Sequence, residues 1–272
     1  GKTTVTAFLA AFSKKAVLTD CDVDAADLYL LLDPHVKQTF EFWGGKKARI
    51  NPEKCTQCGK CSKVCRFDAI SGYKVNEHFC EGCEVCYHIC PEKDVALIDN
   101  LSGHWFIGET QYGPMVFAKL GIAEENSGKL VTAVRKAAKE IAEREGYKWI
   151  ITDGPPGIGC PVIASLSGAD TALVITEPTV SGKHDFDRLI KLSENFKVEV
   201  KVVINKYDLS REKSAEIEEY CHNKGIEIIG EIPFDEDVVK SIAKGVPLIE
   251  FSWGPAAKAI EGIAKRLIDI CS

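Results

Sequence analysis

Eight of the twelve cysteines in this 272-residue chain fall into two matching runs. Both runs have the spacing C-x2-C-x2-C-x3-C, and one constant interval separates every cysteine of the first run from its counterpart in the second. The lead-in is repeated at the same interval, since Ile50-Asn51 is echoed by Val75-Asn76. A tandem repeat of this spacing is typical of ligands to iron–sulfur clusters.

The spacing also predicts which cysteines share a cluster. Three thiolates in a C-x2-C-x2-C loop can wrap one face of a cubane, whereas the fourth cysteine lies too far along the chain and ligates the other cluster. We therefore expect two [4Fe–4S] clusters, one on Cys55, Cys58, Cys61 and Cys90 and the other on Cys80, Cys83, Cys86 and Cys65. Residues 49–99 are predicted to be an inserted α+β domain, a bacterial-type two-cluster ferredoxin.

Zinc binding and disulfides are the alternatives for these cysteines. Structural zinc sites normally bring two separated pairs of ligands, and disulfides suit small secreted domains. Neither explains two tandem runs with identical offsets as well as clusters do. One departure from the usual pattern is that Pro91 follows Cys90 but Arg66 follows Cys65, which places a cation near a cluster.

The chain opens with Gly1-Lys2-Thr3-Thr4, the second half of the phosphate-binding loop G-x-x-x-x-G-K-[ST]. A helix is predicted over residues 4–14, directly after this loop, and a strand over 16–20. Lys2 would reach the β- and γ-phosphates, and the Thr3 hydroxyl would ligate Mg²⁺, while backbone amides from Gly1 to Thr4 cradle the phosphates. We expect the preceding strand and the earlier glycines of the loop to lie upstream of Gly1.

Short apolar runs alternate with helical patterns through the rest of the chain. Such runs predict strands of a mostly parallel sheet covered on both faces. Strands are expected within 149–153, 172–175, 200–204 and 226–229, and a helix is expected around 130–141. The sequence thus predicts a doubly wound α/β P-loop NTPase domain formed by residues 1–48 and 100–272.

Acidic residues stand where two of these strands end, which is where ligands bind in open α/β sheets. Asp20 and Asp22 follow one strand, and Asp153 ends another. Gly157, in the segment after Asp153, leaves room for a γ-phosphate and could respond to its loss. A single aspartate of this kind is more often a helix N-cap. The phosphate loop, the Asp20 motif and the Asp153 motif together, in this order, favour a nucleotide site.

Five segments carry a family resemblance, in this order: GKTT, TDCDVDAADLYLLL, the cysteine insert, residues 125–131 and DGPPGIGCPV. With them the chain resembles MinD/Mrp-type P-loop ATPases with an inserted two-cluster ferredoxin domain. That group is related in fold to the nitrogenase iron protein and to iron–sulfur scaffold ATPases. The resemblance spans essentially the whole chain. It implies Mg-ATP hydrolysis with Lys2 and Asp22 as catalytic residues, Asp22 orienting the attacking water, and Asp20 and Asp153 serving the metal. It also implies a nucleotide-dependent homodimer and, before Gly1, a further lysine that reaches the partner's nucleotide.

The base of the nucleotide is less clearly specified. Asn205-Lys206-Tyr207-Asp208 spells NKxD, in which GTPases use the aspartate to read guanine. In the MinD-like group an asparagine at this place contacts adenine, and Pro233 would lie near the base. The local motif alone favours GTP, whereas the resemblance favours ATP. We expect ATP.

Cys160 lies seven residues after Asp153. The nitrogenase iron protein places at this interval a cysteine that ligates a cluster shared between subunits. That arrangement needs a second cysteine from an earlier segment, and residues 91–159 contain none. A packed or redox-sensitive thiol is therefore favoured over a shared cluster.

Composition limits the possible partners. The net charge of −6 argues against a nucleic-acid partner, and no apolar stretch approaches the ~18 residues that span a bilayer. Helix 256–270 mixes acidic and basic residues on its polar face, so we expect it to pack on its own domain rather than on a membrane. The many reduced thiolates imply a cytoplasmic protein.

Three functions fit these observations. The leading one is an ATP-hydrolysing switch that couples nucleotide state to electron transfer, or to metallocofactor chemistry, on an unidentified redox or apo-metalloprotein partner. The alternative is a scaffold or carrier that assembles iron–sulfur clusters. A spatial organiser resembling MinD or ParA is the third, and it leaves the cysteine insert unexplained.

Overall fold

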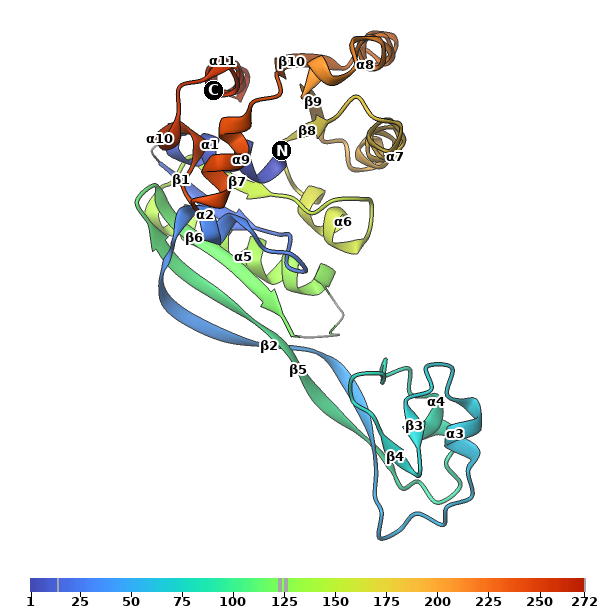
Figure 1. Cartoon of the computed structure of the whole chain (residues 1–272). Helices are drawn as coiled ribbons and strands as arrows, with labels where there is room; N and C mark the ends of the chain where they lie inside the picture. The colour runs from blue at the N-terminus through green and yellow to red at the C-terminus, as the bar shows by residue number, and fades with distance from the viewer. Residues whose placement is uncertain (14, 122–123, 125–126, 272) are drawn as a thin grey trace.

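The computed structural model describes residues 1–13, 15–121, 124 and 127–271. It consists of an α/β body and a small cysteine-rich unit held away from that body by a long two-stranded ribbon (Figure 1). We call residues 51–94 the cysteine module. Lys14 of the predicted helix 4–14, and residues 125 and 126 of the motif 125–131, lie outside the described residues.

The strands of the α/β body form two hydrogen-bonded sheets. One has the order β2-β5-β6-β1-β7, in which β1 pairs in parallel with β6 and β7, and the pairs β2–β5 and β5–β6 are antiparallel. The other has the order β10-β9-β8 and is entirely parallel. The strands are β1 Ala16–Asp20, β2 His35–Ile50, β5 Val95–Thr110, β6 Gly113–Leu120, β7 Trp149–Asp153, β8 Thr171–Thr176, β9 Glu199–Asn205 and β10 Glu227–Ile232. The predicted α/β fold with a mostly parallel sheet is confirmed, although its strands are divided between two sheets.

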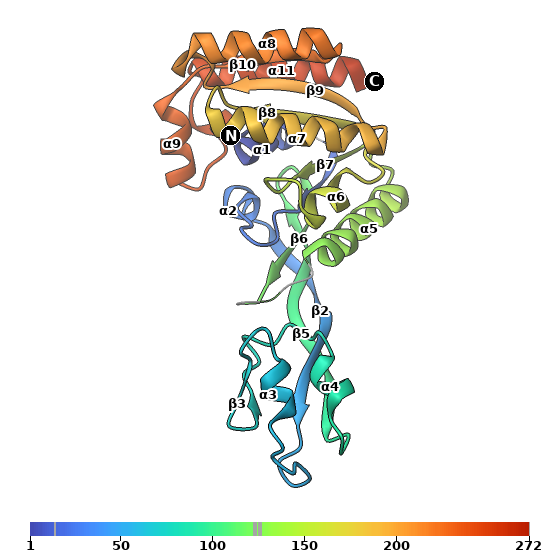
Figure 2. The same ribbon diagram turned by 90° about the vertical axis from the view of Figure 1, so that its right-hand side faces the viewer.

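Helices cover both faces of these sheets (Figures 1 and 2). On one face, Leu130, Val134 and Ile141 of α5 pack on a core that includes Val17 of β1 and Val116 of β6. On the other face, α1 packs through small residues and through a phenylalanine, all of them buried. The helices of the body are α1 Lys2–Ser13, α2 Leu28–Leu32, α5 Ser127–Glu145, α6 Cys160–Leu166, α7 Val180–Phe196, η1 Tyr207–Leu209, α8 Arg211–Lys224, α9 Glu236–Ala243, α10 Leu248–Phe251 and α11 Pro255–Cys271.

The C-terminal helix α11 docks on its own domain, as its sequence predicts. Ile260 and Ile263 are buried against a core that contains Val5, Phe8 and Val203. Within the part of the chain that the structure describes, no helix has the length and apolar character needed to cross a membrane.

The ribbon that carries the cysteine module is formed by β2 and β5, each 16 residues long. Its antiparallel register runs from the pair His35 and Glu109 to the pair Ile50 and Val95. Strand β6 pairs with β5 only from Gly103 onward, so the far half of the ribbon has two strands. Figure 1 shows this half extending beyond the body to the module.

The backbone of the cysteine module repeats at the same interval as the cysteines do. Helices α3 Lys60–Val64 and α4 Val85–Ile89 occupy equivalent places, and the short strands β3 Ile70–Ser71 and β4 Lys74–Val75 pair between them. Gly59 and Glu84 both have positive φ, of 73° and 65°, at the start of these helices. The duplication is therefore present in the conformation of the chain as well as in its sequence.

Candidate functional site

Two buried carboxylates lie side by side at the ends of adjacent parallel strands. Asp20 of β1 is in register with Asp153 of β7, and their exposed fractions are 0% and 2%. Burial, followed by the charge of Asp153, raises the pKa of Asp20 to about 7. A divalent cation would offset this repulsion, so the pair fits a magnesium site.

Helix α1 brings hydroxyl groups to the same place. Thr6 Oγ1 donates a hydrogen bond to Asp153 Oδ1 at 3.1 Å. Burial raises the pKa of Asp153, while hydrogen bonds from the Thr3 and Thr6 side chains act in the opposite direction. Thr3, the expected Mg²⁺ ligand, therefore lies beside Asp153, the carboxylate expected to help hold that ion.

Lys2, at the start of α1, and Asp22, after the end of β1, interact through their charges. Burial raises the pKa of Asp22, and the positive charge of Lys2 counteracts the rise. Lys2 is exposed and Asp22 is half-buried, so both can meet a ligand. The loop of Asp22 is fixed by Asp20, whose Oδ1 accepts from the Asp22 N–H at 3.1 Å and whose Oδ2 accepts from the Leu28 N–H at 3.0 Å.

The segment after Asp153 holds the candidate phosphate sensor Gly157. Its φ is +84°, a conformation that side chains with a Cβ rarely adopt, and a Cβ there would meet no atom within 4 Å. The residue is exposed, so its amide can approach a ligand in the open space beside it.

A cavity beside the start of α1 has the character of a base pocket. It brings together Gly1, Thr4, Asn205 and Pro233, all of which the sequence assigns to nucleotide binding, with apolar side chains such as Ile232. Thr4 is only 4% exposed, and its hydroxyl has no hydrogen-bond partner among the described residues. A buried polar atom left unpaired in a cavity fits a site that a ligand completes.

Asp208 is placed differently from the other predicted base contacts. It lies outside the residues that line this cavity, and its Oδ1 accepts a hydrogen bond from the Phe234 N–H at 2.8 Å. The carboxylate thus stabilises the segment after β10. This geometry does not favour a role in reading guanine.

Glu177, which follows β8, was not predicted. Its Oε1 accepts from Asn205 Nδ2 at 2.9 Å and pairs with Lys206 Nζ at 3.0 Å, which orients the Asn205 amide. An acidic residue directly after a parallel strand is the signal that could have identified it.

Three cysteines of the first run line a second cavity, in the cysteine module. Cys55, Cys58, Cys61 and Cys90 all face it, together with apolar residues that include Ile50 and Val95. The fold therefore brings the last cysteine of the second run to the first run. The Cys90 Sγ accepts a backbone hydrogen bond from Asp94 at 3.4 Å, as a cluster thiolate would.

Three cysteines of the second run lie near one another, since the charges of Cys80 and Cys83 both act on Cys86. Cys86 is buried in the small core of the module, and Cys65 and Cys80 pack against the same core. Burial, followed by the charge of Cys80, raises the pKa of Cys86. Cys80 Sγ accepts a hydrogen bond from the Ala48 N–H of β2 at 3.5 Å, whereas Cys83 is exposed.

All twelve cysteines are free thiols in the structure. In the described part of the chain, no three His, Cys, Asp or Glu side chains are grouped closely enough to hold a metal ion. The observations that bear on cluster binding are therefore the spacing of the two cysteine runs and the lining of the cavity in the cysteine module.

Cys160 is exposed at the first residue of α6. It lies against the start of α5, where a Cβ on Gly128 would come within 2.9 Å of the Cys160 Cβ. Cys221 is buried in α8, and Cys271 is half-buried in α11. These positions suit packing roles for the last two cysteines.

The fold and the strand-end carboxylates define an α/β nucleotide-binding protein. The family model "CobQ/CobB/MinD/ParA nucleotide binding domain" matches residues 1–248. The chain belongs to this family and is a P-loop, ATP-binding ATPase.

Relatives of known sequence include an uncharacterized protein of Methanocaldococcus jannaschii, MJ0578, which is 37% identical over 98% of this chain and 92% of its own length. MinD of Bacillus subtilis is 28% identical over 54% of this chain and 57% of its own length. Among solved structures, Aquifex aeolicus MinD has a TM-score of 0.57 at 23% identity, covering 99% of this chain and 92% of its own. Pyrococcus horikoshii MinD complexed with Mg-ADP has a TM-score of 0.59 at 18% identity, covering 100% and 93%. The two structural likenesses concern the fold.

Proposed function

We propose that this chain is an Mg-ATP-hydrolysing iron–sulfur protein that couples nucleotide state to electron transfer, or to metallocofactor chemistry, on a partner. The observation that carries the proposal is the cavity lined by Cys55, Cys58, Cys61 and Cys90 at the end of a ribbon attached to an ATPase. Residues 49–99 form the inserted ferredoxin domain in this proposal, and 1–48 and 100–272 form the ATPase domain.

In the proposed nucleotide site, Lys2 and the amides from Gly1 to Thr4 hold the phosphates. Thr3 would ligate Mg²⁺, and Asp20 and Asp153 would help to hold the ion. Asp22 orients the attacking water, its carboxylate balanced by Lys2. Gly157 lies where its backbone can respond to the γ-phosphate.

Adenine is the proposed base. Asn205, oriented by Glu177, and Pro233 lie in the candidate base pocket, where the unpaired Thr4 hydroxyl would also find a partner. The hydrogen bond from the Phe234 N–H occupies the Asp208 carboxylate, which supports ATP over GTP.

In the cysteine module, Cys55, Cys58, Cys61 and Cys90 would hold one [4Fe–4S] cluster, and Cys80, Cys83, Cys86 and Cys65 the other. Such clusters supply one-electron transfer when bound. The apolar core around Ile50, Ile70 and Val95 would shield bound clusters from water.

A nucleotide-dependent homodimer in the cytoplasm is part of the proposal. The structure of an Aquifex aeolicus MinC:MinD complex is an example of a similar fold that binds another protein. We propose that the partner of this chain is a redox protein or an apo-metalloprotein, and that no nucleic acid is bound.

Two other functions remain candidates. A cluster scaffold or carrier would use the same cysteines but release its clusters to an apo-protein in a nucleotide-dependent way. A MinD-like spatial organiser is supported by the sequence likeness to MinD proteins. Sedimentation with anionic liposomes in the presence of ATP would favour that organiser.

Anaerobic purification and reconstitution test the proposal. We expect the iron content to approach eight atoms per chain and the reduced protein to give the EPR signals of [4Fe–4S]⁺ clusters. The Lys2→Ala variant should lose hydrolysis and keep both clusters. An iron content of four or less, or zinc in place of iron, would contradict the two-cluster proposal.

A further inference from the structure

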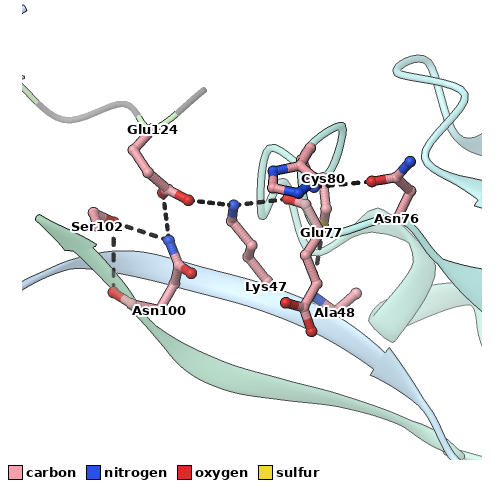
Figure 3. A network of polar contacts seen from close by, with 9 residues as sticks. Lys47, Ala48, Asn76, Glu77, Cys80, Asn100, Ser102 and Glu124 are labelled. Atoms are coloured by element: carbon pink, nitrogen blue, oxygen red, sulfur yellow. Dashed lines mark hydrogen bonds and ion pairs between the residues drawn. The ribbon is translucent and has the colours of Figure 1, made fainter. Parts of the chain in front are cut away.

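We infer that Lys47 and Glu124 form a positioning ion pair that fixes the cysteine module relative to the α/β body and transmits nucleotide state between them. The inference about position rests on the structure, and the inference about transmission rests also on the proposed function. Lys47 Nζ lies 2.7 Å from Glu124 Oε1, and the two side chains are 8% and 13% exposed (Figure 3).

On the side of the module, β2 is attached directly to the second cysteine run. Lys47 Nζ donates to the backbone oxygen of Glu77 at 2.7 Å, three residues before Cys80. The next residue, Ala48, donates its N–H to Cys80 Sγ. A Cβ on Gly82 would lie 2.1 Å from the Lys46 oxygen, so the loop that holds these cysteines can approach β2 only with glycine there.

On the side of the body, Glu124 lies between the end of β6 and the start of α5. Its Oε2 accepts a hydrogen bond from Asn100 Nδ2 of β5. Its N–H donates to the Gly121 oxygen at 3.2 Å, and Gly121 N–H donates to the Ser102 oxygen at 2.8 Å. Lys47 and Glu124 therefore connect the module with the ribbon, and the Glu124 N–H connects them to Gly121, directly after β6 (Figure 3).

From Glu124 the connection continues through described residues to the nucleotide site. The Glu124 N–H donates to the oxygen of Gly121, which directly follows Leu120 at the end of β6. The Leu120 N–H donates at 3.5 Å to the oxygen of Val23, the residue after Asp22. A movement of the Asp22 loop with the γ-phosphate would thus reach Glu124 through the end of β6.

The ribbon needs additional support because its far half has only two strands. We call the ion pair of Lys47 and Glu124 the brace. An isolated two-stranded ribbon is marginally stable and twists easily, so it does not by itself fix a domain at its end. A buried ion pair can do so, because breaking it leaves an uncompensated charge away from water. Burial acts to raise the pKa of Glu124, but hydrogen bonds from Lys47 and Asn100 outweigh it and lower the pKa, so the carboxylate is ionised at neutral pH.

The same two strands offer a matched control. Lys37 of β2 and Glu109 of β5 form an ion pair at 3.1 Å, but their side chains are 54% and 44% exposed. Exposed ion pairs of this kind contribute little to the free energy of folding. Glu109→Gln therefore removes the same chemical group as Glu124→Gln from the same ribbon without touching the brace.

Hydrogen exchange measured by mass spectrometry on the anaerobic holoprotein tests whether the brace fixes the position of the cysteine module. In Glu124→Gln and in Lys47→Met, we expect amides in 46–50 and 77–82 to exchange about tenfold faster or more, because the local opening that exposes them costs less. Amides of α7 and α11 should be unchanged, which shows that the variants fold, and Glu109→Gln should match the wild type throughout. Wild-type exchange at 46–50 and 77–82 in both brace variants would overturn the inference.

Cluster potentials test the transmission. Mg-nucleotide should shift the midpoint potentials of the wild type and of Glu109→Gln, and the shift should be lost in Glu124→Gln. A shift of wild-type size in Glu124→Gln would overturn the transmission role. A wild-type protein without clusters would contradict the proposed function instead, and the exchange comparison made on the protein as isolated would still test the position of the module.

Discussion

Asn51 and Asn76, which occupy equivalent places in the two halves of the cysteine module, make the same two sets of contacts. Each side-chain oxygen accepts from the backbone N–H two residues later at 3.0 Å, Glu53 in one half and His78 in the other. The Asn51 N–H donates to the Asp94 oxygen, and the Asn76 N–H donates to the Ala69 oxygen. Since Ala69 and Asp94 are separated by the same interval as the two asparagines, each half pairs with the other in the same way.

This crossed pairing makes the cluster assignment testable with double variants. If Cys58 and Cys90 serve the same cluster, replacing both with alanine should remove one cluster and leave about four iron atoms. Replacing Cys83 and Cys90 should disturb both clusters and leave much less iron. Iron analysis and EPR of the two reconstituted variants give the comparison, and the reverse order of iron content would refute the crossed assignment.

Asp94 is a position where the two halves differ in charge. It lines the cavity of Cys55, Cys58, Cys61 and Cys90, and its Oδ2 is buried without a partner among the described residues, whereas the equivalent residue is Ala69. A nearby negative charge disfavours adding an electron to a cluster. Asp94→Ala should therefore raise the midpoint potential of one cluster and leave the other unchanged in an EPR-monitored redox titration. Unchanged potentials for both clusters would show that Asp94 does not tune them.

The buried pair Asp20 and Asp153 predicts a pH dependence. Because the pKa of Asp20 is raised to about 7, its contribution to stability is fully present below its ordinary value of 3.8 and is lost as the pH rises through about 7. The metal-free protein should therefore lose stability over this range, and Asp20→Asn should show a shallower loss in denaturant unfolding. An equal slope in the variant would contradict the assignment.

Binding of Mg²⁺ should have the opposite pH dependence, because the metal requires the ionised carboxylates. Well below pH 7 the apparent affinity for Mg²⁺ in the presence of ADP should fall by about tenfold per pH unit. Isothermal titration calorimetry between pH 5.5 and pH 8, values chosen as roughly one and a half units below and one unit above that pKa, would measure it. An affinity independent of pH would place Mg²⁺ away from Asp20.

The base pocket predicts different outcomes for the two ends of the NKxD motif. Asn205→Ala should weaken ATP binding by about tenfold, because a hydrogen bond in a desolvated pocket is lost. Asp208→Ala should change ATP affinity by less than about threefold, since its carboxylate bonds to the Phe234 N–H. Fluorescent-nucleotide titrations with ATP and GTP as competitors would measure both. A selective loss of GTP affinity in Asp208→Ala would revive the guanine-reading role.

Local patterns predicted the elements of the α/β body well. Strands such as β1 and β9 are rich in short apolar runs, and α5 has clear helical periodicity, so the sequence of each element predicts it directly. The division of the strands between two sheets depends on which strands become neighbours, which such runs do not specify. The ribbon was missed as a structure because most residues of β2 are exposed on both faces, which removes the alternation that marks a strand.

The candidate sites were likewise predictable where a local pattern specifies them and not where they depend on contacts between distant residues. The cysteine spacing predicted that Cys90 would lie with the first run, because in a repeat of this spacing the fourth cysteine of one run ligates the cluster of the other. The brace was not predictable, since Lys47 and Glu124 are 77 residues apart and neither stands in a motif. The role of Asp208 was also hidden, because a hydrogen bond to the Phe234 N–H depends on a loop 26 residues further along the chain.

The central claim is that nucleotide and clusters are coupled, and the affinity for Mg-nucleotide in two redox states tests it most directly. A ligand can shift only an equilibrium whose two states it binds unequally, and the coupling must be reciprocal. Anaerobic titration with oxidised and then dithionite-reduced protein should give affinities that differ by about 5- to 150-fold. Equal affinities, together with cluster potentials that Mg-nucleotide does not move, would contradict the switch and favour the scaffold.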